Sequence, residues 1–467
     1  MNRDKEKKEV RNVRVTRDII MLSDIKRGIQ QALQLVQIFT KGGVTEMNKL
    51  SKLILGVSFM LGIILAPQLS SAGEIDILIE KLVDKGVLTH GEAQQILTET
   101  KEEMRTQLAQ GKVESLPKWI QNMKLKGDFR LRYQYDEKRL SAKSGRHRGR
   151  IRYRLGVDTK VNDQFQVGAG LASGSDDPRS TNETLKDTFS TKRIQLDYAY
   201  AAYTAAPWVT FYGGKMIRKP VLWEPSDLLW DGDINPEGVA AHFEKKINPL
   251  VFFNTGWFIL DADESNGDRG EPWMAYFQPG IEHNFDENTK IKAAVTAYII
   301  NTKGWEMDHS DGINTSGSPD AYNYDAISPA VEVSITDPFD GIVPYCALFG
   351  EYVTAFDPPR DETGYALGLK FGDKSVKDWG QWQGKYIYRR LERDAWPDFL
   401  PDSDAYDGDT NVKGHEFILT YGLAKNVTLG LDYYYMQPIK ALPGISDHSN
   451  GKDNIQHVVQ LDLVLKF

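Results

Sequence analysis

Residues 460–467 read QLDLVLKF, and they belong to a run in which apolar and polar residues alternate. The apolar face holds Val459, Leu461, Leu463, Leu465 and Phe467, the other face holds Gln460, Asp462 and Lys466, and Val464 is the exception. A period of two is typical of a β-strand. The last residues of soluble domains are usually poorly ordered. An apolar face that continues to Phe467 therefore predicts a strand that needs a partner on that face.

The same alternation begins at Met123 and recurs along the rest of the chain. In MKLKGDFRLRYQY (123–135) and RIRYRLGV (150–157), apolar and aromatic residues occupy one face, and basic residues dominate the other. We expect sixteen strands, which begin near residues 123, 148, 165, 193, 208, 238, 250, 272, 289, 322, 343, 361, 380, 412, 427 and 454. This gives about 21–22 residues for each strand and its link, which suits membrane strands of roughly 9–11 residues.

The links between these expected strands alternate in length. Short turns are expected at 162–164, 206–207, 248–249, 286–288, 337–341, 373–378 and 424–426, and longer polar links at 138–147, 174–191, 218–237, 262–271, 304–321, 394–411 and 441–453, with 357–360 as a short exception. A soluble β-sandwich also alternates along its strands, but this asymmetry of links is typical of outer-membrane barrels. The sequence therefore predicts an all-β fold for residues 119–467. It is a transmembrane antiparallel β-barrel of about 16 strands, with Phe467 at the periplasmic rim.

The residues before the expected barrel have a different character. Residues 47–72 combine a basic start, an apolar run of 14 residues and a small-residue cleavage site, which predicts a signal peptide. The apolar run is short for a membrane helix, which needs about 20 residues. Residues 1–46 form a leader that this anatomy does not explain, and we expect translation to begin at Met47. Residues 73–118 show helical spacing of apolar residues and predict a short N-terminal helical segment in the periplasm.

The charge and cysteine content exclude several classes of function. Without residues 1–72, the chain has 45 basic and 59 acidic residues, a net charge of −14, which argues against nucleic acid as a partner. Cys346 is the only cysteine and cannot form an internal disulfide. The expected partner of the outer face is outer-membrane lipid.

No motif indicates an enzyme. The eight histidines include no H-E-x-x-H motif. Residues 261–271, DADESNGDRGE, resemble a calcium loop but have Asn266 where a glycine is required and Pro272 where the closing glutamate belongs. Residues 402–409, DSDAYDGD, are interpreted as a solvated acidic loop in preference to a cation site. His457 is expected to face outward but has no convincing serine partner for a barrel lipase. We therefore predict no catalytic residue, no metal site and no cofactor.

The chain resembles the putative porins of Gram-negative outer membranes over essentially all of its mature length. The resemblance rests on EIDILIEKLVDKGVLTHGEAQQIL (74–97), KLKGDFRLRYQYD (124–136) and GGKMIRKPVLWEPSDLLWDGDINPEGVAAHFE (213–244). It implies a passive, water-filled channel for small hydrophilic solutes and ions, assembled as a homotrimer. It also implies that Phe467 is the signal read by the barrel-assembly machinery. The helical segment could contact a sister subunit or the cell wall.

The sequence also predicts where the channel narrows. Residues 218–237 contain enough apolar residues to pack inside the barrel, and they carry Glu224, Asp227, Asp231 and Asp233. Strands one and two would present a basic wall to the lumen, formed by Lys124, Lys126, Arg130, Arg132, Arg150, Arg152 and Arg154, because charged residues on the lipid face would be unfavourable. We expect the loop to fold inward, with its carboxylates facing the basic wall across the pore. The alternative is that the arginines pair with carboxylates of the wall and the loop folds outward.

Two other functions remain open from the sequence. One is a channel specific for sugars or organic acids, in which Trp223, Trp230 and Trp305 form a stacking track. The other is a structural tether of the cell envelope, in which the helical segment binds the cell wall and the pore is incidental.

Overall fold

The computed structural model describes residues 118–140, 145–262, 271–315, 320–339 and 341–467. The expected leader (1–46), the signal peptide (47–72) and all of the helical segment (73–118) except Lys118 lie outside the described residues. No helix among the described residues is both long and apolar enough to cross a membrane.

The described residues form one short helix, two single turns of 3₁₀-helix and seventeen strands. These are α5 (Lys118–Gln121), β1 (Lys124–Lys138), β2 (Arg146–Lys160), β3 (Phe165–Ser173), β4 (Glu183–Thr184), β5 (Ile194–Ala206), β6 (Val209–Lys215), β7 (Glu237–Lys245), β8 (Leu250–Ile259), β9 (Trp273–Asn284), β10 (Thr289–Asn301), β11 (Ala326–Thr336), β12 (Tyr345–Ala355), β13 (Thr363–Gly372), β14 (Trp382–Leu391), η2 (Tyr406–Gly408), β15 (Val412–Ala424), β16 (Val427–Pro438), η3 (Gly451–Asp453) and β17 (Gln456–Lys466).

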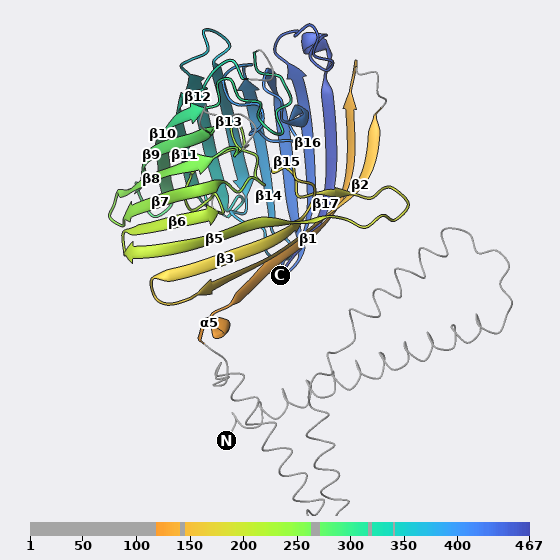
Figure 1. Ribbon diagram of the computed structural model, residues 1–467. Coiled ribbons are helices and arrows are strands. Elements are labelled where there is room, and N and C mark those ends of the chain that lie inside the picture. Colours follow the sequence, from red (N-terminus) through yellow and green to blue (C-terminus); the bar gives the residue numbers. More distant parts are fainter. Residues whose placement is uncertain (1–117, 141–144, 263–270, 316–319, 340) are drawn as a thin grey trace, which may run out of the picture. The chain divides into compact units, whose positions relative to one another are not determined.

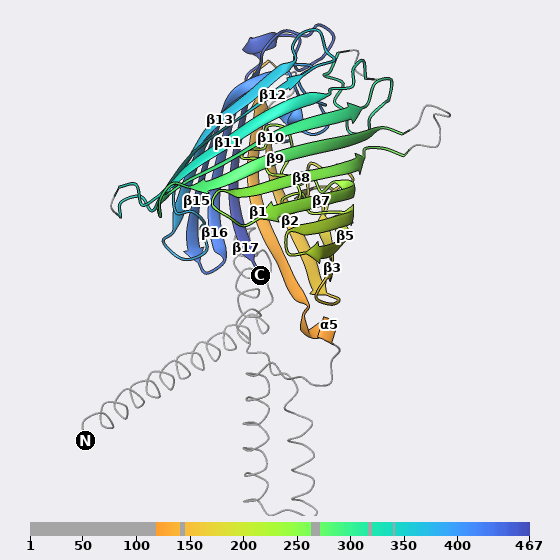
Figure 2. The ribbon, with the colours of Figure 1, turned by 90° about the vertical axis from the view of Figure 1, so that its left-hand side faces the viewer.

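The strands form a closed antiparallel barrel. Every long strand pairs with the next long strand along the chain, and β1 pairs with β17 from Asp128–Lys466 to Lys138–Gln456. Figures 1 and 2 show β1, in orange, beside β17, in blue, where the barrel closes. The two-residue β4 pairs only with the edge of β2 near Arg150. Sixteen strands therefore make the wall, which confirms the predicted fold and strand count.

The alternation of the sequence sets the two faces of the wall. On β1, Leu125 is 68 % exposed and Leu131 is 43 % exposed. Arg132, which lies between the outward-facing Leu131 and Tyr133, is 3 % exposed. On β17, Leu461 faces outward and Gln460 is fully buried. Apolar residues thus form the outer surface and polar residues face the interior, as an outer-membrane barrel requires.

The links confirm the predicted asymmetry. Seven short links, at 161–164, 207–208, 246–249, 285–288, 337–344, 373–381 and 425–426, lie at the end of the barrel where β1 begins and β17 finishes. We call this the turn end. Eight links lie at the other end, the loop end, at 139–145, 174–193, 216–236, 260–272, 302–325, 356–362, 392–411 and 439–455. The links 216–236 and 392–411 pack inside the barrel, and we call them the first and second lumen loops; Trp305, Met307 and Tyr324 of the link 302–325 belong to the same buried cluster.

Candidate functional site

The first lumen loop (216–236) packs inside the barrel because half of it is apolar. Val221, Leu222, Leu228, Leu229 and Trp230 are each at most 2 % exposed, and they belong to one buried cluster with inward residues of β7 to β14. Burying this much apolar side chain stabilises the inward position of the loop. The cluster occupies the side of the lumen formed by these strands.

Hydrogen bonds from inward side chains fix the path of this loop. Tyr276 on β9 donates from its hydroxyl to the carbonyl of Val221 at 2.7 Å. Gln278, two residues further on, accepts from the amide of Trp223 at 2.9 Å and donates to its carbonyl at 2.8 Å. These side chains satisfy backbone groups that would otherwise be buried without partners. The sequence carries no signal for these roles of Tyr276 and Gln278, because their partners are backbone atoms of a loop without regular structure.

Two of the four predicted acidic residues lie away from the basic wall. The carboxylate of Glu224 lies 3.6 Å from Arg218 within the same loop and 3.4 Å from the hydroxyl of Tyr298. Burial raises the pKa of Glu224 to about 8, and Arg218 only partly offsets this effect. Asp227 lies 2.6 Å from Arg389 on β14. Burial alone would raise the pKa of Asp227, but Arg389 and Lys385 outweigh it and hold that pKa below its usual value.

Asp231 and Asp233 lie nearer to the wall. Asp231 accepts hydrogen bonds from the amides of Asp233 and Ser403, both at 2.8 Å, and burial together with the charge of Asp233 raises its pKa to about 7. Asp233 lies 3.4 Å from Arg154 and accepts from the amide and hydroxyl of Thr181 at 3.1 and 2.9 Å. Burial opposes ionisation of Asp233, but the nearby arginines outweigh it and lower its pKa. Of the four acidic residues, Asp233 is the one that forms an ion pair with the basic wall.

The arginines of the basic wall pair mainly with carboxylates of the wall itself. Arg132 makes a two-point contact with Asp462 on β17, at 2.7 and 2.8 Å. Arg152 and Arg154 both contact Asp128, at 2.8 and 2.7 Å. The structure thus combines elements of the two alternatives: the loop lies inside, and the arginines are paired within the wall.

The remaining members of the basic wall differ in their partners. Arg130 donates to the side chain of Asn182 at 2.5 Å, and Asp462 lies 3.5 Å away. Arg150 donates to Gln134 at 3.0 Å and to Ser180 at 3.2 Å. Lys126 pairs with Asp158 at 2.5 Å, and Lys124 is exposed at the turn end.

The second lumen loop (392–411) contains the acidic stretch 402–409, and each of its four aspartates contacts a different basic side chain. Asp402 lies 3.3 Å from Arg389, Asp404 lies 3.1 Å from Arg132, Asp407 lies 2.7 Å from Lys138, and Asp409 lies 2.8 Å from His448. The interpretation of 402–409 as a solvated acidic loop holds for Asp407, whose side chain is 67 % exposed, and is wrong for Asp402 and Asp409, which are buried. The aspartates tie the loop to β14, to β1 and to the link 439–455. Their spacing was visible in the sequence, but Arg132 and Lys138, the partners of Asp404 and Asp407, lie more than 260 residues away along the chain.

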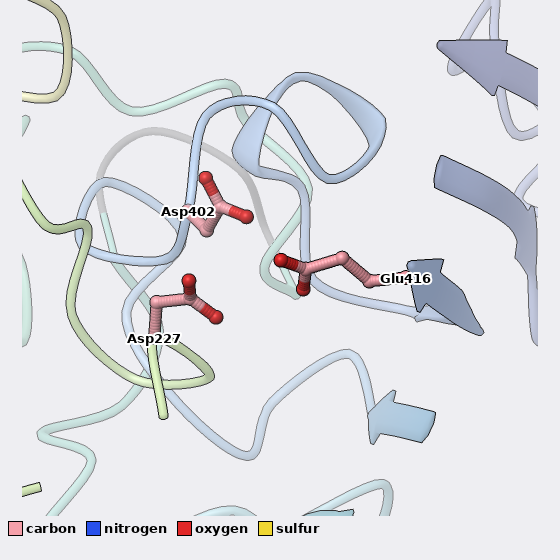
Figure 3. Close-up of side chains that lie close together, drawn as sticks. All are labelled: Asp227, Asp402 and Glu416. Carbon is pink, nitrogen blue, oxygen red and sulfur yellow. The ribbon is translucent and has the colours of Figure 1, made fainter. Parts of the chain in front are cut away.

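Asp227, Asp402 and Glu416 bring carboxylate oxygens within 4.8 Å of one another (Figure 3). Such a cluster could ligate a cation, but Arg389 already lies among the three. Its guanidinium is 2.6 Å from Asp227, 2.5 Å from Glu416 and 3.3 Å from Asp402. The arrangement is therefore an ion-pair network that joins both lumen loops to β14 and β15.

Two cavities with charged residues in their lining lie against the basic wall. The larger, of about 540 Å³, lies toward the turn end, and its lining includes Lys126, Asp128, Arg154, Arg218 and Asp233. The smaller, of about 190 Å³, lies toward the loop end, and we call it the outer cavity. Its lining includes Gln134, Asp136, Arg148, Arg150, Ser180 and Asp404. Each lumen loop meets the wall at one of these cavities: Asp233 contacts Arg154 in the lining of the larger one, and Asp404, which lines the outer cavity, contacts Arg132.

The predicted tryptophan track is not available to a solute. Trp230 is 1 % exposed and Trp305 is 5 % exposed, and both belong to the buried apolar cluster. Trp223 is half-buried, with the ammonium of Lys292 4.9 Å from its ring centre. The stacking-track interpretation is wrong for Trp230 and Trp305, because the apolar residues around them fill the lumen on that side.

Phe467 lies on the outer face at the turn end. Its backbone exchanges two hydrogen bonds with Gly127 on β1, at 2.9 and 3.0 Å. Its ring is 56 % exposed and lies 6.3 Å from the ring of Tyr153. Gly127 leaves the space that the ring occupies, since a Cβ atom there would lie 2.6 Å from it.

Comparison with known proteins identifies a family. The model of a family described as putative porin matches residues 138–334 and 351–467, which is more than half of the chain. No curated protein matches the chain.

Several solved porin structures resemble the chain weakly. A triple mutant of Rhodopseudomonas blastica porin is 12 % identical, with a TM-score of 0.40, and the match covers 74 % of this chain and 100 % of that one. OmpF of Salmonella typhi, in complex with daunomycin, is 12 % identical with a TM-score of 0.45, over 74 % of this chain and 97 % of that one. OprB of Pseudomonas putida is 9 % identical with a TM-score of 0.49, over 78 % and 96 %.

Proposed function

Because the chain belongs to the putative porin family and its strands close into a barrel, we propose that the conducting path of this outer-membrane diffusion channel follows the inner face of β1, β2 and β17. The family and the barrel together make the chain an outer-membrane channel for passive diffusion. The route of solutes through it, its selectivity and its assembly are the parts that we propose.

The observation that carries the proposal is the uneven filling of the lumen. Apolar residues of the first lumen loop belong to one buried cluster with β7 to β14, and such close packing excludes water. The larger cavity and the outer cavity lie on the opposite side, against the basic wall. Water and small solutes therefore pass along the charged side of the lumen.

The narrowest part of this route lies where the two lumen loops meet the wall. Asp233 of the first loop faces Arg154, and Asp404 of the second loop faces Arg132. Acidic groups on one side and arginines on the other create a transverse field, which orients polar solutes as they pass. The sequence-based expectation assigned this role to four acidic residues of one loop. The contacts favour one residue from each loop.

Reversal potentials in a salt gradient test the proposed route. The Asp233→Asn variant removes a charge beside the wall and should shift ion selectivity towards anions. The matched variant Asp227→Asn removes the same charge on the β14 side, beside Arg389, and should shift selectivity less. Both shifts should shrink at high salt, because the Debye length falls from about 10 Å at 0.1 M to about 3 Å at 1 M. Equal shifts, or a larger shift for Asp227→Asn, would place the route elsewhere.

We also propose that the channel is a homotrimer that buries the wall around β3 and β5. Segment 185–193 runs from β4, which pairs with β2, to the start of β5, and Phe189 in it is fully exposed. Asp187, Thr188 and Phe189 all have positive φ angles, between 50° and 66°. Residues other than glycine rarely adopt this conformation, so the segment holds a defined shape that presents the phenylalanine ring.

Molar mass in detergent tests the trimer. Phe189→Asp should weaken the trimer, because it would bury a charge in the subunit contact. Phe356→Asp is the matched control, since Phe356 is 65 % exposed and follows β12 on the opposite side of the barrel. Equal effects of the two variants, or a monomeric wild-type channel, would exclude this interface.

A substrate-specific channel remains the second candidate within transport. The loss of the tryptophan track removes the sequence argument for sugar stacking. The charged lining of the outer cavity instead favours organic acids among the solute classes considered. The structural tether remains a proposal for the N-terminal segment, which lies outside the described residues.

A further inference from the structure

We propose that the outer cavity is a binding subsite for small hydroxylated monocarboxylates, with Arg150 as the residue that binds the carboxylate. This inference deepens the proposed function and rests on it, because the subsite lies on the proposed conducting route.

Arg150 differs from the other wall arginines in having only neutral partners. Its two hydrogen bonds go to the amide oxygen of Gln134 and the hydroxyl oxygen of Ser180. Among the described residues, no carboxylate oxygen lies within 4.0 Å of a guanidinium nitrogen of Arg150, which is the limit for an ion pair. In contrast, Arg132 and Arg152 contact aspartates at 2.7–2.8 Å. Arg150 is therefore the wall arginine at this cavity without a carboxylate in direct contact.

Arg150 also retains donors for a ligand. Of the five N–H donors of a guanidinium group, two are held by Gln134 and Ser180, and the Nε–H, like those of Arg130 and Arg148, is buried without a partner. Guanidinium groups present their N–H donors in a planar fork that matches the two oxygens of a carboxylate. An oxyanion that approaches from the cavity can take up donors of the two terminal nitrogens, including those now held by Gln134 and Ser180.

The other groups of the cavity limit the charge of the ligand. Four aspartates line the cavity, and each is paired with a basic side chain: Asp136 with Arg148 at 2.6 Å, Asp404 with Arg132, Asp177 with Arg179 and Asp407 with Lys138. A second negative charge on the solute would approach these carboxylates and be repelled. One negative charge is therefore preferred, which favours a monocarboxylate over a phosphate dianion.

Neutral groups of the cavity suit the hydroxyls of the solute. Ser180 accepts hydrogen bonds from Arg150 and from Asn182, so its own proton can be donated to the ligand. Ser403 also lines the cavity. The volume of about 190 Å³ is roughly six times the share of one water molecule in the liquid, about 30 Å³. A solute of about six heavy atoms, such as lactate, fits this space.

Current block in planar bilayers tests the subsite with the purified full-length channel. Lactate is titrated into 0.1 M potassium chloride, and glycerol, which also has six heavy atoms but no charge, serves as the control solute. We expect lactate to reduce the single-channel current at concentrations about tenfold lower than glycerol. Arg150→Gln should raise the half-blocking concentration of lactate about tenfold, equivalent to about 1.4 kcal/mol. Arg150→Lys should give an intermediate value because it keeps the charge but loses the planar fork.

Arg148→Gln is the matched control variant. It removes the same charge two residues away on the same strand, but from an arginine that is already paired with Asp136. We expect it to change the half-blocking concentration less than twofold. Equal effects of Arg150→Gln and Arg148→Gln would show that lactate responds only to the overall positive charge of the wall, and would overturn the subsite. Stronger block by phosphate than by lactate would overturn the assigned class of solute. A wild-type channel that conducts without lactate block would contradict the subsite alone, whereas a folded barrel without conductance would contradict the proposed function.

Discussion

Phe467 and Gly127 show how one residue at the rim depends on another. The alternation of the sequence predicted that Phe467 faces outward, but it gave no indication that a glycine on β1 makes room for the ring. A Cβ atom on Gly127 would lie 2.4 Å from the carbonyl oxygen of Arg154 and 2.6 Å from the ring. A side chain at position 127 must therefore displace the ring, or the strand, or both.

We predict that Gly127→Val and Phe467→Asp both lower the yield of folded barrel. The first displaces the ring, and the second removes an aromatic anchor from the rim and the proposed assembly signal. Heat-modifiable migration on gels measures the folded fraction. Gly213→Ala is the control, because the nearest atom to its added Cβ would be 4.0 Å away. Unchanged yield for both test variants would contradict the role assigned to this contact.

Glu224 links the pH to the packing of the first lumen loop. Its carboxyl is held in the loop by Arg218 and Tyr298, with Glu351 and Asp227 as negative neighbours, and burial raises its pKa to about 8. Glu224 therefore keeps its proton up to a higher pH in the folded channel than in the unfolded chain. The contribution of Glu224 to the stability of the fold is fully present below its unfolded pKa, about 4.3. It falls as the pH rises above that value and is lost as the pH passes about 8.

We predict that current fluctuations increase between pH 6 and pH 9.5, because the ionised Glu224 loosens the packed loop. The Glu224→Gln variant keeps a neutral side chain of the same size and should remove this dependence. Single-channel recordings at several pH values measure the effect. An unchanged pH dependence in Glu224→Gln would assign it to another group.

At the scale of elements, the strands were predictable and the lumen loops were predictable only in part. Strand positions follow from a local period of two, and the predicted starts lie within a few residues of the observed ones. The inward position of the first lumen loop followed from its apolar content. The second lumen loop could not be foreseen, because its aspartates contact Arg132 and Lys138, more than 260 residues away along the chain.

We predict that the double variant Asp404→Asn, Asp407→Asn loosens the second lumen loop. Both ion pairs with β1, Arg132–Asp404 and Lys138–Asp407, are lost. Arg132 keeps Asp462 and Lys138 keeps Asp447, so the main consequence is a weaker attachment of the loop to the wall. The expected result is a lower temperature for heat modification and a larger single-channel conductance. Asp308→Asn, on the exposed part of another loop, is the control for the loss of charge. Identical conductance in the double variant and the wild type would show that these ion pairs do not hold the loop in the channel.

At the scale of the whole molecule, the fold follows from the membrane as a solvent. A closed barrel satisfies every strand edge, and an apolar outer face alternates with a polar inner face. Both features follow from the period-two alternation of apolar and polar residues in the sequence. The position of the channel within the barrel is not, because it depends on how two loops and sixteen strands share the lumen. The uneven filling by the apolar cluster determines that the proposed route follows the basic wall.

The decisive measurement is the conductance of the purified protein in planar bilayers. We predict large, stable steps with weak ion selectivity, because a hydrated route remains along β1, β2 and β17. Gels that show heat-modifiable migration of the same preparation establish that the barrel is folded. A folded barrel that gives no conductance steps at any voltage would contradict the claim that this protein is a channel.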